Sequence, residues 1–176
     1  MKDSFNLEEA YWKQTEALVR CVPQYAALRQ ITLERVNVSE IQSLSRFVNA
    51  TRLQFASNLI QKYQTACIDV YKPVVLTNDA VRRLIAPPVV EWHEGRPILF
   101  DGTHRVWTAL RNGMKWIYVL SLRDVNLPLP CEITPWGQVT VRPDKYSRNE
   151  NLRSLNMLYY RPVTDTFNSD RSILLE

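Results

Sequence analysis

The sequence lacks the features that define several common classes of protein. No apolar run approaches ~20 residues, so it predicts no membrane span, and the N-terminus lacks the apolar centre of a signal peptide. Its three cysteines, Cys21, Cys67 and Cys131, lie far apart and form no C-x-x-C pair. This pattern predicts reduced thiols in a cytoplasmic protein rather than a disulfide framework or a zinc site.

Familiar catalytic signatures are missing as well. The chain has no P-loop, no G-x-G-x-x-G, no G-x-S-x-G and no cluster with metal-ligand spacing. No basic run marks an extended DNA groove. Function therefore has to be argued from a smaller pattern.

Length and composition predict one globular domain, or one domain with an appended tail. The 176 residues are 45% hydrophobic and 23% charged, enough for a core without staples. The net charge of +4 is uneven: residues 1–71 carry +1, residues 72–121 carry +3 and residues 122–176 are neutral. The excess at the centre of the chain either arises by chance or is typical of a protein that binds a small polyanion such as a nucleotide, and it is compatible with nucleic acid.

The most informative stretch runs from Pro97 to Val119. Its pattern predicts a short buried strand, a tight turn at Asp101-Gly102, a helix to about Asn112 and a second strand from Lys115 to Leu122. Thr103 is predicted to cap the helix with its hydroxyl. Asn112-Gly113 is a helix stop signal.

This stretch crowds polar groups into the first turn of a helix. Free backbone N–H groups and the positive end of the helix dipole lie there, which makes an anion site. Arg105 either forks phosphate oxygens or forms a structural salt bridge. His104 either holds phosphate and exchanges protons or is a structural histidine. Asp101 is either a general base or magnesium ligand, or a turn former.

A second pair of candidates precedes the motif. Residues 89–93 and 97–100 are predicted to form a hairpin around Glu94-Gly95-Arg96. Glu91 and His93 then point to the same side of their strand. They either act in catalysis or ion binding, or belong to the structure.

The flanking regions give weaker predictions. Helices are expected over residues 7–20, within a long region from Ser39 to Tyr63, and from Thr77 through Leu84. Strands are expected at residues 31–36 and 71–76. Residues 132–141 suggest a small hairpin. The chain from Arg142 onward is polar, and we expect an irregular tail that lies over the domain or over a partner.

The pattern strand, Asp101-Gly102-Thr103-His104-Arg105, helix, Asn112-Gly113, strand resembles the ParB/sulfiredoxin superfamily, over residues 70–122. The resemblance implies an α+β fold with a small mixed sheet, and it assigns the ParB/sulfiredoxin-like core to residues 71–122. Residues 1–70 and 123–176 lie outside the resemblance. Their own patterns predict a helical N-terminal extension packed on the core and a C-terminal hairpin and tail of the same domain. Sulfiredoxins carry a reactive cysteine where this chain has Thr103, so sulfiredoxin chemistry is not expected.

The resemblance also implies a function. Gly102, Thr103, His104 and Arg105 would bind the phosphates of a nucleoside triphosphate, ATP or CTP, with magnesium near Asp101. Asp101, His104 and Glu91 would serve hydrolysis or phosphoryl transfer. One alternative is an enzyme or binding protein that acts on nucleic acid, such as a DNase or a DNA-modifying protein, with the same fold. Another is a non-catalytic inhibitor, of plasmid or phage type, whose tail binds a partner protein. No membrane partner is expected.

Overall fold

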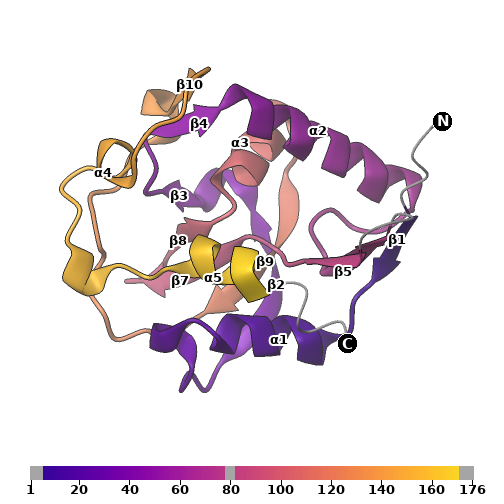
Figure 1. Cartoon of the computed structure of the whole chain (residues 1–176), viewed down its shortest axis with the longest axis horizontal. Coiled ribbons are helices and arrows are strands. Elements are labelled where there is room, and N and C mark those ends of the chain that lie inside the picture. The colour runs from indigo at the N-terminus through magenta and orange to yellow at the C-terminus, as the bar shows by residue number, and fades with distance from the viewer. Residues whose placement is uncertain (1–5, 78–81, 171–176) are drawn as a thin grey trace.

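The fold is built on a five-stranded sheet with the strand order β2-β9-β7-β8-β3 (Figure 1). The computed structural model describes residues 6–77 and 82–170. β7 runs antiparallel to β8 and parallel to β9, β2 is antiparallel to β9, and β3 is parallel to β8. The strands are β2 (Ile31–Asn37), β3 (Gln42–Ser43), β7 (Val89–His93), β8 (Arg96–Asp101) and β9 (Trp116–Leu122). The predicted hairpin, the strand at residues 31–36 and the two strands that flank the motif helix are confirmed.

Two smaller sheets lie beside the central one. An antiparallel sheet has the order β1-β5-β6, and a parallel pair joins β4 to β10. Their strands are β1 (Asn6–Glu9), β5 (Val74–Thr77), β6 (Arg82–Ile85), β4 (Phe47–Asn49) and β10 (Thr140–Arg142). The β4–β10 pair brings the segment around residue 141 against the segment that leads into α2.

Helices cover both faces of the central sheet (Figure 1). The α-helices are α1 (Trp12–Arg20), α2 (Ala50–Thr65), α3 (Thr103–Arg111), α4 (Arg148–Asn151) and α5 (Val163–Asp170). Single 3₁₀ turns are η1 (Pro23–Tyr25), η2 (Val38–Glu40), η3 (Trp136–Gln138) and η4 (Met157–Tyr159). α2 packs against α3, while α1 packs against α5.

Alternating side chains of the central strands divide the core into two layers. Val90 and Val119 belong to the cluster under α2 and α3, whereas Val89 and Leu120 belong to the cluster under α1 and α5. Successive strand residues point to opposite faces, so a strand buried on both faces is apolar at every position. The chain is therefore a mixed α+β structure whose central sheet lies between helical layers.

The N-terminal seventy residues are not the helical extension that the sequence predicts. They contribute four strands, of which β2 and β3 belong to the central sheet. The helix predicted at residues 7–20 is a strand followed by α1, because Leu7 pairs with Leu76 of β5 and no side chain caps α1. The long helix predicted from Ser39 begins only at Ala50, where the Asn49 side chain caps α2.

Two further predictions about secondary structure are wrong. The helix expected through Leu84 is β6 at Arg82–Ile85, because these residues pair with β5; residues 78–81 of that prediction lie outside the described residues. The hairpin expected over residues 132–141 does not form, because β10 pairs with β4 instead. The tail is also less irregular than expected, since it contains α4 and α5.

Within residues 6–77 and 82–170, no helix is both long enough and apolar enough to cross a membrane.

Candidate functional site

The motif occupies the junction between β8 and α3. β8 ends at Asp101, and Gly102 is the N-cap of α3 with a φ of +97°. A Cβ on residue 102 would lie 2.8 Å from the Cβ of Pro88, so both the backbone conformation and the space require glycine here. Thr103 does not cap the helix as predicted, because it is already the first helical residue. Its hydroxyl instead forms a hydrogen bond with the Ser45 hydroxyl at 3.1 Å.

Asp101 and Arg105 hold each other. Arg105 Nη2 donates to Asp101 Oδ2 at 3.0 Å, and Thr164 of α5 donates its hydroxyl to Asp101 Oδ1 at 2.6 Å. Arg105 Nη1 also donates to the Ala86 carbonyl, and its guanidinium lies 5.8 Å from the centre of the Tyr71 ring. Both side chains are largely buried, at 8% and 13% exposure. These contacts form a brace between β8, α3 and α5.

This brace bears on the predicted magnesium site. Both oxygens of Asp101 already accept hydrogen bonds from cationic or hydroxyl donors. In the described part of the chain, no group of three or more His, Cys, Asp or Glu side chains is placed to hold a metal ion. Each oxygen of Asp101 thus keeps only part of its acceptor capacity, and a magnesium ion near Asp101 stays a prediction.

His104 is uncharged near neutral pH. Its Nε2 accepts a hydrogen bond from the backbone N–H of Asn49 at 2.9 Å, which leaves the ring proton on Nδ1. Burial lowers its pKa to about 4, and the nearby Arg52 adds to this effect. His104 therefore positions the start of α2 against the start of α3 and adds no positive charge of its own.

The beginnings of α2 and α3 consequently lie together. Neither helix has an acidic residue in its first turn, although the positive dipole end favours one. α2 instead carries Arg52 there, an exposed residue for which the structure shows neither an ion pair nor a side-chain hydrogen bond within the described ranges. In α3, the backbone N–H groups of residues 103–105 have no acceptor among the described residues. Positive charge and free donors thus converge on one place.

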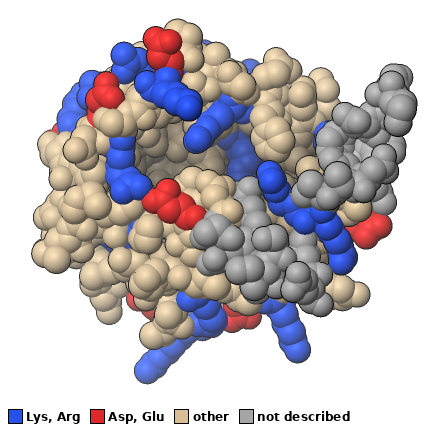
Figure 2. Space-filling view, viewed as in Figure 1, with Lys and Arg blue, Asp and Glu red and all other residues tan. Residues whose placement is uncertain are grey.

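The surface at this place is concave. Figure 2 shows a hollow in the region where Figure 1 places the N-terminal end of α3, with Lys and Arg side chains along its rim. Much of this basic character comes from segments outside the motif. Residues 44–53 hold two arginines and no acid, and residues 140–153 hold four basic and two acidic residues. Together these two segments carry a charge of +4, as much as the whole chain. The sequence alone had located the excess positive charge in residues 72–121.

Glu91 has a different environment from the one predicted. It is fully buried between the sheet and the C-terminal segment, where both its oxygens accept from Arg161 at 3.0 and 3.1 Å. Tyr25 donates its hydroxyl to Oε1 at 2.5 Å, and His93 Nε2 lies 2.7 Å from Oε2. Glu91 and His93 share a strand face as predicted. Both carboxylate oxygens of Glu91 therefore already have hydrogen-bond partners.

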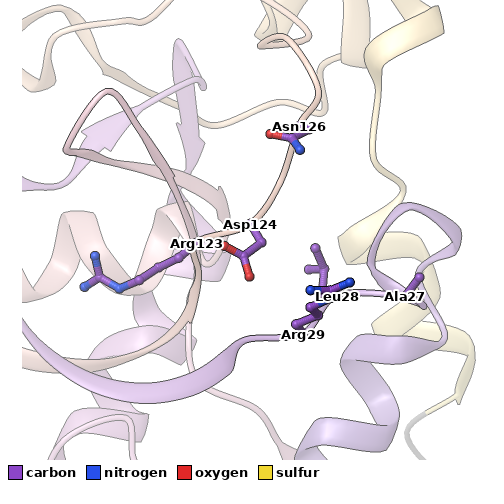
Figure 3. A pocket seen from close by; sticks show the side chains of 6 residues that line it. All are labelled: Ala27, Leu28, Arg29, Arg123, Asp124 and Asn126. Atoms are coloured by element: carbon purple, nitrogen blue, oxygen red, sulfur yellow. The ribbon is translucent and has the colours of Figure 1, made fainter.

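Two cavities lie away from the motif. One, of about 480 Å³, lies between the loop before β2 and the segment after β9 (Figure 3). The other, of about 250 Å³, lies beside Trp116 and Tyr118 of β9. Neither is lined by a motif residue. The larger one is lined by Ala27, Leu28, Arg29, Arg123, Asp124 and Asn126.

Sequence reasoning located the motif but missed its partners. Thr164 and Arg161 lie 63 and 70 residues from the carboxylates they contact, and no local pattern signals such pairing. Arg52 could have been found from the sequence, because it follows the capping residue Asn49 in a first helical turn, where an acidic residue is favoured.

The fold defines a mixed α+β protein with helices on both faces of its sheet, and comparisons with known proteins add little to this class. No protein-family model matches the chain, and no curated protein matches it. The solved structure of protein Atu1540 from Agrobacterium tumefaciens is similar over 53% of this chain, with 10% sequence identity and a TM-score of 0.36. The match covers 40% of that protein. None of these comparisons tests the resemblance to the ParB/sulfiredoxin superfamily, which stays a prediction.

Proposed function

We propose that the protein binds a phosphate ester, such as the phosphates of a nucleotide, where the first turns of α2 and α3 meet. The observation that carries the proposal is the uncompensated positive character of this place. The N-termini of α2 and α3 lie together, and neither has an acidic residue in its first turn. The first contributes the Arg52 cation, and the second contributes the free N–H groups of residues 103–105. An anion bound there would satisfy the free donors and the charge together.

The proposal reassigns the predicted phosphate-binding residues. Gly102 and Thr103 keep their role, because they begin α3, where the backbone N–H groups have no acceptor among the described residues. Arg105 and His104 become positioning residues, since Arg105 braces Asp101 and His104 accepts from Asn49. Arg52 takes over as the cation that contacts phosphate.

Nucleotide hydrolysis would need more than this site offers as it stands. Both Asp101 oxygens accept hydrogen bonds, and Glu91 is enclosed by Arg161. Binding is therefore the part of the predicted function that the geometry supports best. ATP and CTP, the nucleotides implied by the family resemblance, are the first ligands to test.

Calorimetry on the full chain with ATP, CTP and inorganic pyrophosphate, each with and without magnesium, tests the proposal. We expect Arg52→Ala to weaken binding of pyrophosphate and nucleotide by about tenfold or more, the loss of one charge-assisted contact. Without ligand, the same variant should melt about 1–3 °C higher, because it removes a cation from the positive end of α2.

Lys62→Ala is the matched control, because Lys62 lies in the last turn of the same helix. It should leave anion affinity unchanged and should not raise the melting temperature. Wild-type affinity in Arg52→Ala, or no binding of any of the three ligands to the native protein, would contradict the proposal.

A further inference from the structure

A cluster of arginine and aromatic side chains adjoins the proposed phosphate site. The arginine–aromatic cluster comprises Arg46, Phe47, Arg142 and Tyr146. The guanidinium groups of Arg46 and Arg142 lie 5.0 and 4.7 Å from the centre of the Phe47 ring. The Tyr146 ring lies 5.5 Å from Phe47, and its hydroxyl donates to the Phe47 carbonyl at 3.1 Å. One aromatic ring thus orients two guanidinium groups.

The cations of this cluster are only partly compensated. Arg46 Nη1 donates to the Glu150 carbonyl oxygen at 3.1 Å, which satisfies one of its five donors. The nearest carboxylate oxygen to Arg142 is 3.8 Å away, on Glu150, and both side chains are about half exposed. An exposed ion pair at that distance contributes little. Most N–H groups of these two arginines are therefore available to a ligand.

The cluster and the helix starts form one continuous surface. Phe47 and Asn49 belong to β4, which leads directly into α2. Arg142 of β10 pairs with Asn49 of β4 in the parallel ladder. Because Asn49 is the N-cap of α2, the backbone of Arg142 lies on the strand next to the start of that helix. Asn49 in turn donates its N–H to His104 of α3. A ligand whose phosphates are spaced along a chain can therefore contact Arg52 and the cluster at once, whereas a compact anion such as pyrophosphate reaches only one of them.

The shape of this surface favours a polymer over a small molecule. Sites for small ligands enclose most of the ligand's surface, whereas the hollow in Figure 2 is open. The two cavities described above lie at other places in the fold. Cations spread along an open groove are typical of proteins that follow a sugar-phosphate backbone. The free N–H groups belong to the start of a helix, which the backbone of a flexible single strand can reach more easily than that of a rigid duplex.

We infer that the phosphate ester bound at the starts of α2 and α3 belongs to a single-stranded nucleic acid, whose neighbouring phosphates lie on Arg46 and Arg142. This inference rests on the proposed function and specifies the ligand class. It assigns a binding role to Arg46, which directly precedes β4, and to Arg142 of β10, both outside the motif.

Fluorescence anisotropy with labelled oligo(dT) of about 12 nucleotides tests the inference on the full chain. Salt is varied from about 50 to 200 mM, because each neutralised phosphate of a single strand contributes about −0.7 to the slope of log K against log salt. We expect Arg46→Ala/Arg142→Ala to weaken oligonucleotide binding about tenfold or more and to flatten the slope by about 1.4. The same variant should bind inorganic pyrophosphate like the native protein.

Arg96→Ala is the control, because it removes a positive charge at the opposite end of β8 from the motif; it should bind the oligonucleotide normally. Unchanged oligonucleotide affinity in the double variant, with pyrophosphate binding intact, would overturn the inference and leave the proposed function standing. Tighter binding of a duplex of the same length would also overturn it. If the native protein binds neither pyrophosphate nor oligonucleotide, the proposed function fails as well.

Discussion

The charge of His104 depends on one hydrogen bond and on its burial. Its Nε2 accepts from Asn49, and a proton on that nitrogen would break the contact. Burial and Arg52 lower its pKa from 6.5 to about 4. A histidine in a sequence beside an arginine suggests a phosphate contact, but in the fold it is a neutral connector between two helices.

The buried His104 should make the stability of the protein depend on pH. Because its pKa is lower in the folded state than in the unfolded state, the unfolded chain binds a proton first as pH falls. The free energy of unfolding should therefore decrease by up to about 3 kcal/mol from pH 6.5 to pH 4, with little loss from this group above pH 6.5.

Two measurements check this. The chain has only two histidines, so NMR titration of the imidazole signals can resolve His104 from His93. His104→Gln should show a smaller loss of stability over the same pH range. An imidazole that titrates near 6.5 would contradict the expected environment. If an anion binds nearby, saturating pyrophosphate should raise the pKa of His104, since an opposite charge favours the protonated form.

At the scale of elements, Asp101 joins three of them. It ends β8, pairs with Arg105 of α3 and accepts from Thr164 of α5. A buried carboxylate is stable only when its oxygens have partners, so these contacts fix the position of α5 on the sheet. A residue that resembles a catalytic base in the sequence thus has a structural function that is visible only in the fold.

Thr164→Val tests this brace. Valine keeps the shape of threonine but cannot donate, so Asp101 Oδ1 loses its partner while remaining buried. We expect a loss of about 1–3 kcal/mol in the free energy of unfolding by urea. Thr140→Val, an exposed substitution in β10, should change stability by less than about 0.5 kcal/mol. Equal effects of the two substitutions would show that the hydrogen bond does not stabilise α5.

At the scale of the whole molecule, the C-terminal segment belongs to the core. Arg161 is almost fully buried and donates to Glu91 and to the carbonyl oxygens of Leu127, Pro128 and Tyr159. Val163 and Phe167 of α5 complete the apolar layer under α1. Removing residues 142–176 would expose this layer and leave the buried Glu91 without its cation. Such a deletion would therefore disturb folding, whether or not the segment also binds a partner.

Arg161→Met should be strongly destabilising. It leaves the Glu91 charge buried without its cation, which costs about 3–5 kcal/mol in comparable cases. Chemical denaturation measures the effect. Arg153→Met, an exposed arginine of the same segment, is the control and should be nearly neutral.

Glu91→Gln in the Arg161→Met background supplies the second half of the test. It removes the unpaired charge while keeping an acceptor for Tyr25, and it should therefore recover part of the lost stability. If the double variant is as unstable as the sum of the single variants, the two side chains are not coupled.

The sequence by itself determined the local order around the motif. The hairpin, the turn at Gly102, α3 and β9 follow from alternation, helix signals and a glycine, and these depend on neighbours within a few residues. The same kind of reasoning was wrong for residues 7–9 and 82–84. There the side-chain pattern was compatible with helix, and pairing with β5 decided in favour of strand.

Only the tertiary structure decided what the polar residues do. Asp101, Glu91 and His104 meet partners that lie 55 to 70 residues away in the chain. Electrostatic interactions act through space, so the charge and accessibility of a side chain depend on which distant segments fold against it. For the same reason the cations of the candidate site come from the segment before β4, from α2 and from β10 rather than from the motif that first indicated it.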